Sequence, residues 1–172
     1  MIINMLFHED AILKRINDTA LFIRERYRVT GGNKEIVLVI LANGGLRFGR
    51  KLIKLLEYYN VPFISEIVRA NSYEGTERKD VHIRKRKLDV TGKLVFVIDD
   101  IIDSGETMQS VTTWLGSYAP HRLYVITLLT RKPGTADFEG FDISEENRFV
   151  IGFGMDYNGN FRGVNDIYTL VL

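Results

Sequence analysis

Residues 95–107 read VFVIDDIIDSGET, and this stretch decides the fold because an apolar run leads into acidic residues and then into a short Asp-Ser-Gly loop. The apolar run at 95–98 is uninterrupted, which is typical of a strand buried on both faces. Residues 107–115 have helical spacing and contain no proline, so a helix is expected to follow. We therefore predict a strand that turns directly into a helix, with acids and hydroxyls at the turn.

The predicted turn has the features of a phosphate site. Backbone N–H groups and the positive end of the helix dipole meet at the start of a helix, and Ser104 and Thr107 add hydroxyl donors there. Asp99, Asp100 and Asp103 would repel an anion, but carboxylates accept hydrogen bonds from vicinal diols and bind Mg2+. The stretch therefore favours a phosphorylated ribose carrying a metal over the alternative, an acidic strand end that caps the following helix.

The composition indicates one ordinary α/β domain. The chain has 172 residues, 45% of them hydrophobic, and its net charge of +1 gives no overall field that would recruit nucleic acid or a membrane. The absence of cysteine excludes disulfides and thiolate sites and leaves only three histidines as imidazole ligands, which argues against zinc chemistry. The N-terminus lacks the pattern of a signal peptide and no apolar stretch reaches membrane-spanning length, so we expect a cytoplasmic protein.

Apolar periodicity predicts that strands and helices alternate along most of the chain. Residues 70–89 are polar, and Val81 and Ile83 alternate with charges as in a solvated hairpin. This order predicts an α/β fold in a single domain, 1–172, with a mostly parallel doubly wound sheet flanked by helices and ligands at the carboxyl ends of the strands. The expected helices are 9–28, 46–58 and 107–115, and the expected strands are 36–42, 63–68, 95–98, 122–129 and 149–155.

The stretch 95–107 resembles the phosphoribosyl-pyrophosphate motif of the type I phosphoribosyltransferases. In that motif four apolar residues, two acids and two apolar residues precede Asp-[Ser/Thr]-Gly-x-Thr. The resemblance implies that Asp99 and Asp100 bind the ribose 2- and 3-hydroxyls and that the following loop holds the 5-phosphate. The loop residues are Asp103, Ser104, Gly105, Glu106 at the family's variable position, and Thr107.

The loop LANGG, residues 41–45, follows the first core strand. In the family a Leu-[basic]-Gly-[Gly/Ser] loop at this point binds pyrophosphate with backbone N–H groups, so the resemblance assigns that role to Asn43, Gly44 and Gly45. Asn43 replaces the usual Lys or Arg and removes one charge-assisted contact, for which Arg47 is a candidate substitute. A plain strand-to-helix turn remains the alternative.

The polar segment after the second core strand is the candidate lid. In the resembling enzymes a Ser-Tyr pair begins a mobile loop that closes over the site, which here implies Ser72 and Tyr73 at the head of a flexible lid over about residues 71–90. Such a lid would exclude water from a reactive sugar centre. The basic residues at 84–87 are better explained as a solvated strand edge than as a nucleic-acid contact, because no aromatic residues lie among them.

The segment FVIGFGMDYNGNFRGVND, residues 149–166, resembles the 6-oxopurine branch of the family. The branch pattern is Phe-Val-[Val/Ile]-Gly-[aromatic]-x-x-Asp-Tyr, followed by an aromatic-Arg pair. Taken alone, the first Phe is more often a core residue and 156–159 is more often a turn. The resemblance implies that Phe149 stacks on the purine, the Val150 backbone reads its edge, Asp156 lies near the exocyclic position or a second Mg2+, and Arg162 contacts pyrophosphate.

Two basic residues follow the fourth core strand, where the family places a Lys that donates to the purine 6-oxygen. Either Arg131 or Lys132 can take that role, and both are donors, so a 6-oxo group is favoured over a 6-amino group. The purine-binding residues would belong to a small C-terminal hood over about residues 131–172.

The resemblance as a whole implies a purine salvage enzyme. It would transfer the 5-phosphoribosyl group from phosphoribosyl pyrophosphate to hypoxanthine, guanine or xanthine, with Mg2+, in a homodimer or homotetramer. It implies Asp103 as general base near purine N7 and Asp99, Asp100 and Asp156 as metal ligands. A transferase for another base and a nucleic-acid-binding regulator of the same fold stay open as alternatives, whereas no GxGxxG or GxxxxGK[ST] motif supports an unrelated nucleotide-binding module.

Overall fold

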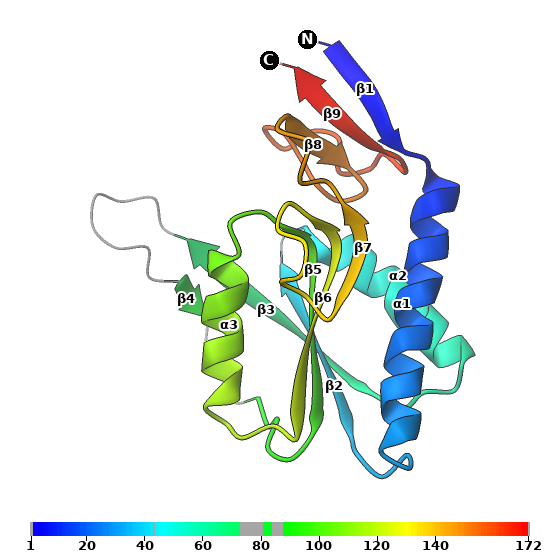
Figure 1. Ribbon diagram of the computed structural model, residues 1–172, viewed down its shortest axis with the longest axis vertical. Coiled ribbons are helices and arrows are strands. Elements are labelled where there is room, and N and C mark those ends of the chain that lie inside the picture. Colours follow the sequence, from blue (N-terminus) through cyan, green and yellow to red (C-terminus); the bar gives the residue numbers. More distant parts are fainter. Residues whose placement is uncertain (1, 43, 73–80, 84–87, 172) are drawn as a thin grey trace.

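Strands and helices alternate along the computed structural model of the chain (Figure 1). The structure describes residues 2–42, 44–72, 81–83 and 88–171. In those residues the helices are α1 (Glu9–Val29), α2 (Gly45–Tyr58) and α3 (Glu106–Gly116). The strands are β1 (Ile2–Phe7), β2 (Ile36–Ala42), β3 (Ile64–Ser72), β4 (Val81–Ile83), β5 (Leu94–Ile102), β6 (Arg122–Thr130), β7 (Phe138–Asp142), β8 (Phe149–Gly152) and β9 (Ile167–Val171).

A large sheet has the strand order β4-β3-β2-β5-β6-β7, in which β4 pairs antiparallel with β3 and the other neighbours are parallel. Helices α1 and α2 cover one face of this sheet and α3 covers the other (Figure 1). In β2, Leu38 and Ile40 belong to the core shared with α1 and α2, whereas Val37 and Val39 belong to the core shared with α3. Because alternate residues face opposite helical layers, the whole strand is apolar. The mostly parallel, doubly wound sheet predicted from the sequence is confirmed.

A small sheet of β1, β9 and β8 lies at one end of the large sheet and brings the two chain termini side by side (Figure 1). All its pairings are antiparallel. The sequence did not predict β1, β7 or β9. As a result, the segment 131–172 expected as a hood is divided: β7 extends the large sheet, whereas β8 pairs with β9 and β9 pairs with the N-terminal strand β1.

The strand of the acidic motif is longer than the sequence indicates. We expected it to end at about residue 98, but β5 continues to Ile102, because β6 keeps pairing with it from Asp99 opposite Thr127 to Ile102 opposite Thr130. The two adjacent carboxylates therefore project from the last part of a strand in the middle of the sheet. In the described part of the chain, none of the helices has the length and apolarity needed to cross a membrane.

Candidate active site

The loop between β5 and α3 forms the predicted turn around a small cavity. Gly105 precedes α3 with φ of 84°, a left-handed conformation that glycine adopts without strain. The Ser104 hydroxyl accepts a hydrogen bond from the Glu106 N–H at 3.3 Å, which fixes the start of the helix. A cavity of about 100 Å³ lies at this turn, where the helix dipole favours an anion. Its lining includes Asp99, Asp103, Ser104, Gly105 and Thr107.

Asp99 and Asp100 lie beside the turn, at the end of the central strand β5. Asp100 is buried, with 6% of its surface exposed. Burial raises the pKa of Asp99 well above its usual value, and the charge of Asp100 raises it further. Burial also raises the pKa of Asp100, although hydrogen bonds and the charge of Arg162 oppose that rise. A bound cation or a pair of hydroxyl donors would stabilise the charged form of both acids.

The Gly44-Gly45 turn lies directly on these two acids. A Cβ atom added to Gly44 would overlap the carboxylate of Asp100, and one added to Gly45 would lie 3.3 Å from the Cα of Asp99. The predicted pyrophosphate turn and the predicted ribose acids, which are far apart in the sequence, are therefore in contact. Asn43 lies outside the described residues.

Arg131 links the phosphate turn to the small sheet. Its Nε lies 3.2 Å from Asp103 Oδ1, and its Nη2 donates to the Arg148 carbonyl at 2.7 Å. Arg148 directly precedes Phe149, so the Arg131 guanidinium spans the space between the candidate base and the candidate purine platform. Lys132 instead lines a neighbouring cavity that includes Ser104. The Arg131 side chain thus contacts both Asp103 and the residue that precedes Phe149.

Phe149 begins β8 with its ring partly in solvent. Its exposed fraction is 48%, and it meets Tyr157 edge to face with ring centroids 5.6 Å apart. Val150, the next residue, is buried in the core. Phe149 is therefore not a core residue, and its exposed ring is available to stack on a flat heterocycle.

Asp156 and Arg162 contact each other. Arg162 Nη2 donates to Asp156 Oδ1 at 2.5 Å, and the Gly159 N–H donates to Asp156 Oδ2 at 2.7 Å, as in the turn considered from the sequence. Within the described residues, no three His, Asp or Glu side chains gather into a group that could hold a metal ion. The expected metal roles of Asp99 and Asp100, and of Asp156 near the exocyclic position or a second Mg2+, stay predictions.

Within the predicted lid, residues 71–90, the structure describes 71–72, 81–83 and 88–90. Ser72 is the last residue of β3, and β4 pairs antiparallel with the end of β3, from Ala70 opposite Ile83 to Ser72 opposite Val81. The expected hairpin pairing is thus present. Tyr73 and the basic residues at 84–87 lie outside the described residues.

A second, larger cavity of about 490 Å³ opens beside Gly44, and the sequence did not predict it. One wall is basic, because α2 carries cations at helical spacing along one side. That spacing was the signal in the sequence that could have revealed it. Residues that line the cavity include Arg47, Arg50, Lys51, Lys54, Gly154 and Arg162.

Known proteins match this chain over most of its length. The family profile described as "Phosphoribosyl transferase domain" matches residues 3–158. The chain is 34% identical to the hypoxanthine phosphoribosyltransferase of Salmonella typhimurium, over 99% of this chain and 96% of the relative. It is 31% identical to the hypoxanthine-guanine-xanthine phosphoribosyltransferase of Tritrichomonas foetus, over 93% of this chain and 87% of the relative. A solved structure of Trypanosoma cruzi hypoxanthine phosphoribosyltransferase, in complex with the product IMP, superposes with a TM-score of 0.86 and 28% identity, covering 98% of this chain and 94% of that one.

Proposed function

The chain belongs to the phosphoribosyltransferase family, and from this premise we propose that it transfers the 5-phosphoribosyl group of phosphoribosyl pyrophosphate to a 6-oxopurine. The products would be a nucleoside 5-monophosphate and pyrophosphate, as in purine salvage. The observation that carries the proposal is the contact of Gly44 with Asp100. It joins a turn suited to pyrophosphate, two acids suited to a ribose diol and the neighbouring phosphate turn in one continuous site.

The sugar phosphate would be held by the turn at the start of α3. Backbone N–H groups and the hydroxyls of Ser104 and Thr107 suit the 5-phosphate, and Asp99 and Asp100 suit the ribose hydroxyls. Fixing the sugar at both ends orients its reactive carbon for attack, and such positioning supplies a large part of the rate enhancement in group transfer.

The purine would lie between Phe149 and the Asp103–Arg131 pair. We propose that Phe149 stacks on the ring, that the Val150 backbone reads its edge and that Arg131 donates to the 6-oxygen. Arg131 is favoured over Lys132 because it already contacts Asp103 and the carbonyl before Phe149. Asp103, held by this ion pair, would accept the proton that the purine loses as the new bond forms.

Magnesium fits the acids of β5. Asp99 and Asp100 are adjacent, the first half-buried and the second buried, and both have raised pKa values, so a cation bound directly or through water would offset their mutual repulsion. The ion would supply charge neutralisation for the departing pyrophosphate. The charge of Arg162 already acts on Asp100, and we propose that it also helps to neutralise the departing pyrophosphate. Asp156 is proposed as the partner that holds the Arg162 side chain.

We also propose that the protein assembles as a homodimer or homotetramer. Ile3 and Met5 on β1 and Val171 on β9 are exposed apolar residues of the small sheet. β1 is an edge strand of that sheet, and exposed apolar edges favour pairing with another chain.

A comparison of bases tests the proposed function. Pyrophosphate release from phosphoribosyl pyrophosphate should be measured with Mg2+ and each of hypoxanthine, guanine, xanthine and adenine. We expect kcat/KM for hypoxanthine or guanine to exceed that for adenine by about a hundredfold or more, because a 6-amino group cannot accept the hydrogen bond of Arg131.

Metal removal provides the control for the same assay. Excess EDTA should abolish release, and excess Mg2+ should restore it. Equal rates with adenine and hypoxanthine would contradict the assigned specificity. Binding of phosphoribosyl pyrophosphate without turnover of any base would instead favour the regulator of the same fold.

A further inference from the structure

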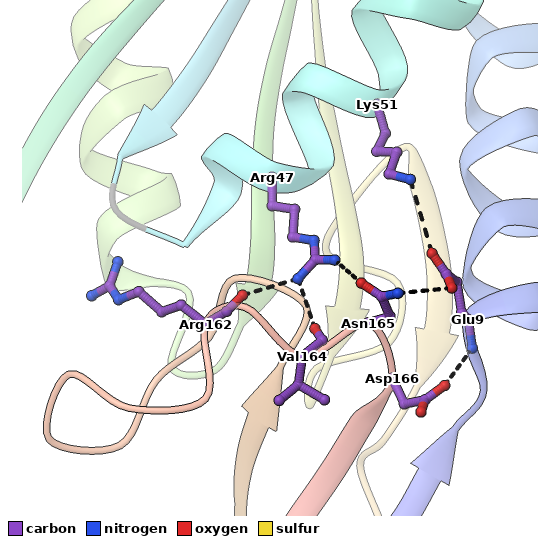
Figure 2. Close-up of polar contacts among 7 residues, drawn as sticks. All are labelled: Glu9, Arg47, Lys51, Arg162, Val164, Asn165 and Asp166. Carbon is purple, nitrogen blue, oxygen red and sulfur yellow. Dashed lines mark hydrogen bonds and ion pairs between the residues drawn. The ribbon is translucent and has the colours of Figure 1, made fainter.

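Arg47 connects α2 to the loop that precedes β9 (Figure 2). Its Nη1 donates to the carbonyl of Arg162 at 3.0 Å and to that of Val164 at 2.7 Å, and its Nη2 donates to the side chain of Asn165. The guanidinium also lies 4.8 Å from the ring centroid of Phe153. The sequence suggested that Arg47 supplies the charge missing at Asn43, but the structure shows its donors turned to this loop instead.

The backbone of this loop is in close contact with α2. A Cβ atom added to Gly154, which has φ of 104°, would lie 3.0 Å from the Gly44 carbonyl oxygen and 3.1 Å from the Arg47 Cβ. The Gly154 N–H also donates to the Arg162 carbonyl at 3.1 Å. The Arg162 carbonyl is therefore held from two sides, and one of the two donors is Arg47.

The side chain of Arg162 extends away from Arg47 (Figure 2). It pairs with Asp156, lines the large cavity together with Gly44 and carries the charge that acts on Asp100. The backbone of Arg162 is thus tied to α2, while its charged group remains on the side of the pyrophosphate turn.

The same loop is tied to the start of α1. Asn165 Nδ2 donates to Glu9 Oε2 at 3.1 Å, and the Glu9 N–H donates to Asp166 Oδ1 at 2.8 Å (Figure 2). Lys51 of α2 lies 4.0 Å from Glu9. These contacts hold the end of the loop next to β9, but among the side chains drawn in Figure 2 the donor that contacts the Arg162 carbonyl itself is Arg47.

We propose that Arg47 is a positioning residue, which sets where the Arg162 side chain lies relative to the pyrophosphate turn by holding the Arg162 backbone. The expected effect on the KM for phosphoribosyl pyrophosphate rests on the proposed function. The expected effect on the order of the loop at Arg162 rests on the contacts alone. Arg47 would thus compensate indirectly for the missing basic residue at Asn43: its donors are used by the loop, and the loop positions Arg162, the arginine proposed to contact pyrophosphate.

Arg47→Met tests the proposal, because methionine has similar length but cannot donate to the two carbonyls. We expect the KM for phosphoribosyl pyrophosphate to rise about tenfold, whereas the KM for the purine and kcat stay within about twofold. In an Arg162→Met background, adding Arg47→Met should change the KM for phosphoribosyl pyrophosphate less than about twofold, because residues acting as a unit are not additive.

Arg24→Met is the matched control. Arg24 lies over the ring of Tyr59, just past the opposite end of α2, so the variant also removes a cation from an aromatic ring. Its kinetics should match those of the wild type.

A full tenfold effect of Arg47→Met on the KM for phosphoribosyl pyrophosphate in the Arg162→Met background would overturn the proposal. An equal rise in the purine KM would also overturn it. Should Arg47→Met fail to fold, Arg47→Lys, which can reach one carbonyl but not hold two, is expected to show a smaller rise confined to the same substrate.

A tryptic cleavage assay separates this inference from the proposed function. The bond after Arg162 should be cut about tenfold faster in Arg47→Met than in the wild type, since its carbonyl has lost a donor and the loop opens more often. Arg24→Met should leave the cleavage rate unchanged. If no base is turned over, the proposed function fails while this assay still decides the role of Arg47, and an unchanged cleavage rate would contradict that role.

Discussion

Gly44→Ala is expected to lower kcat/KM by about a hundredfold or more, since misplacing reacting groups by about 1 Å has an effect of that size. The added methyl group would overlap the carboxylate of Asp100, which is buried and has little freedom to move. Either the turn or the acid must shift, and both are proposed to hold the same substrate. The backbone of Gly44 has ordinary helical angles, so the effect comes from lost space and not from backbone strain.

Steady-state kinetics together with a thermal melt measure this effect. Gly116→Ala is the matched control, because a Cβ atom there meets nothing within 4 Å and the residue ends a helix. The control should retain wild-type kinetics. Near-normal activity of Gly44→Ala would contradict the contact between the turn and Asp100 as the centre of the site.

Asp103→Asn is expected to lower kcat by about a hundredfold or more while changing both KM values little, because general base catalysis contributes a factor of that order. Asparagine retains the shape of the side chain and can still accept a hydrogen bond from Arg131. It cannot take the purine proton. Asp103 is well exposed, with its side chain 75% accessible, so the substitution should not destabilise the fold.

Asp18→Asn provides the comparison for this variant. Asp18 is a half-buried acid paired with Arg15 on α1, so the same change of charge occurs there outside the site. Its kinetics should be those of the wild type. An unchanged kcat in Asp103→Asn would remove Asp103 from the role of base, whereas a rise in the KM of phosphoribosyl pyrophosphate alone would place it among the binding residues.

The central fold could be predicted from the sequence because its signals are local. The run at Val37–Val39 is apolar on both faces, and the spacing of Leu52 and Leu56 gives α2 a buried side. β1 and β9 could not be predicted in the same way. Each is short, and each depends on pairing with a segment at the opposite end of the chain, which no local pattern indicates.

For the candidate site, the positions of the motifs could be predicted from the sequence, but the pairings between side chains could not. The motif from Asp99 to Thr107 and the turn at Gly44 were recognisable because each lies at or just beyond the end of a buried strand, and the parallel sheet brings strand ends together. Side-chain pairings were not recognisable. The contact of Arg131 with Asp103, the pairing of Asp156 with Arg162 and the use of Arg47 to hold backbone carbonyls all depend on which way a side chain points in the folded chain.

Product identification tests the central claim most directly. The wild-type protein should be incubated with Mg2+, phosphoribosyl pyrophosphate and hypoxanthine, and the nucleotide and pyrophosphate should be quantified by chromatography. The account predicts inosine 5-monophosphate and pyrophosphate in equal amounts, with neither formed when hypoxanthine is omitted. Formation of no nucleotide, or release of pyrophosphate with free ribose 5-phosphate in place of the nucleotide, would contradict it.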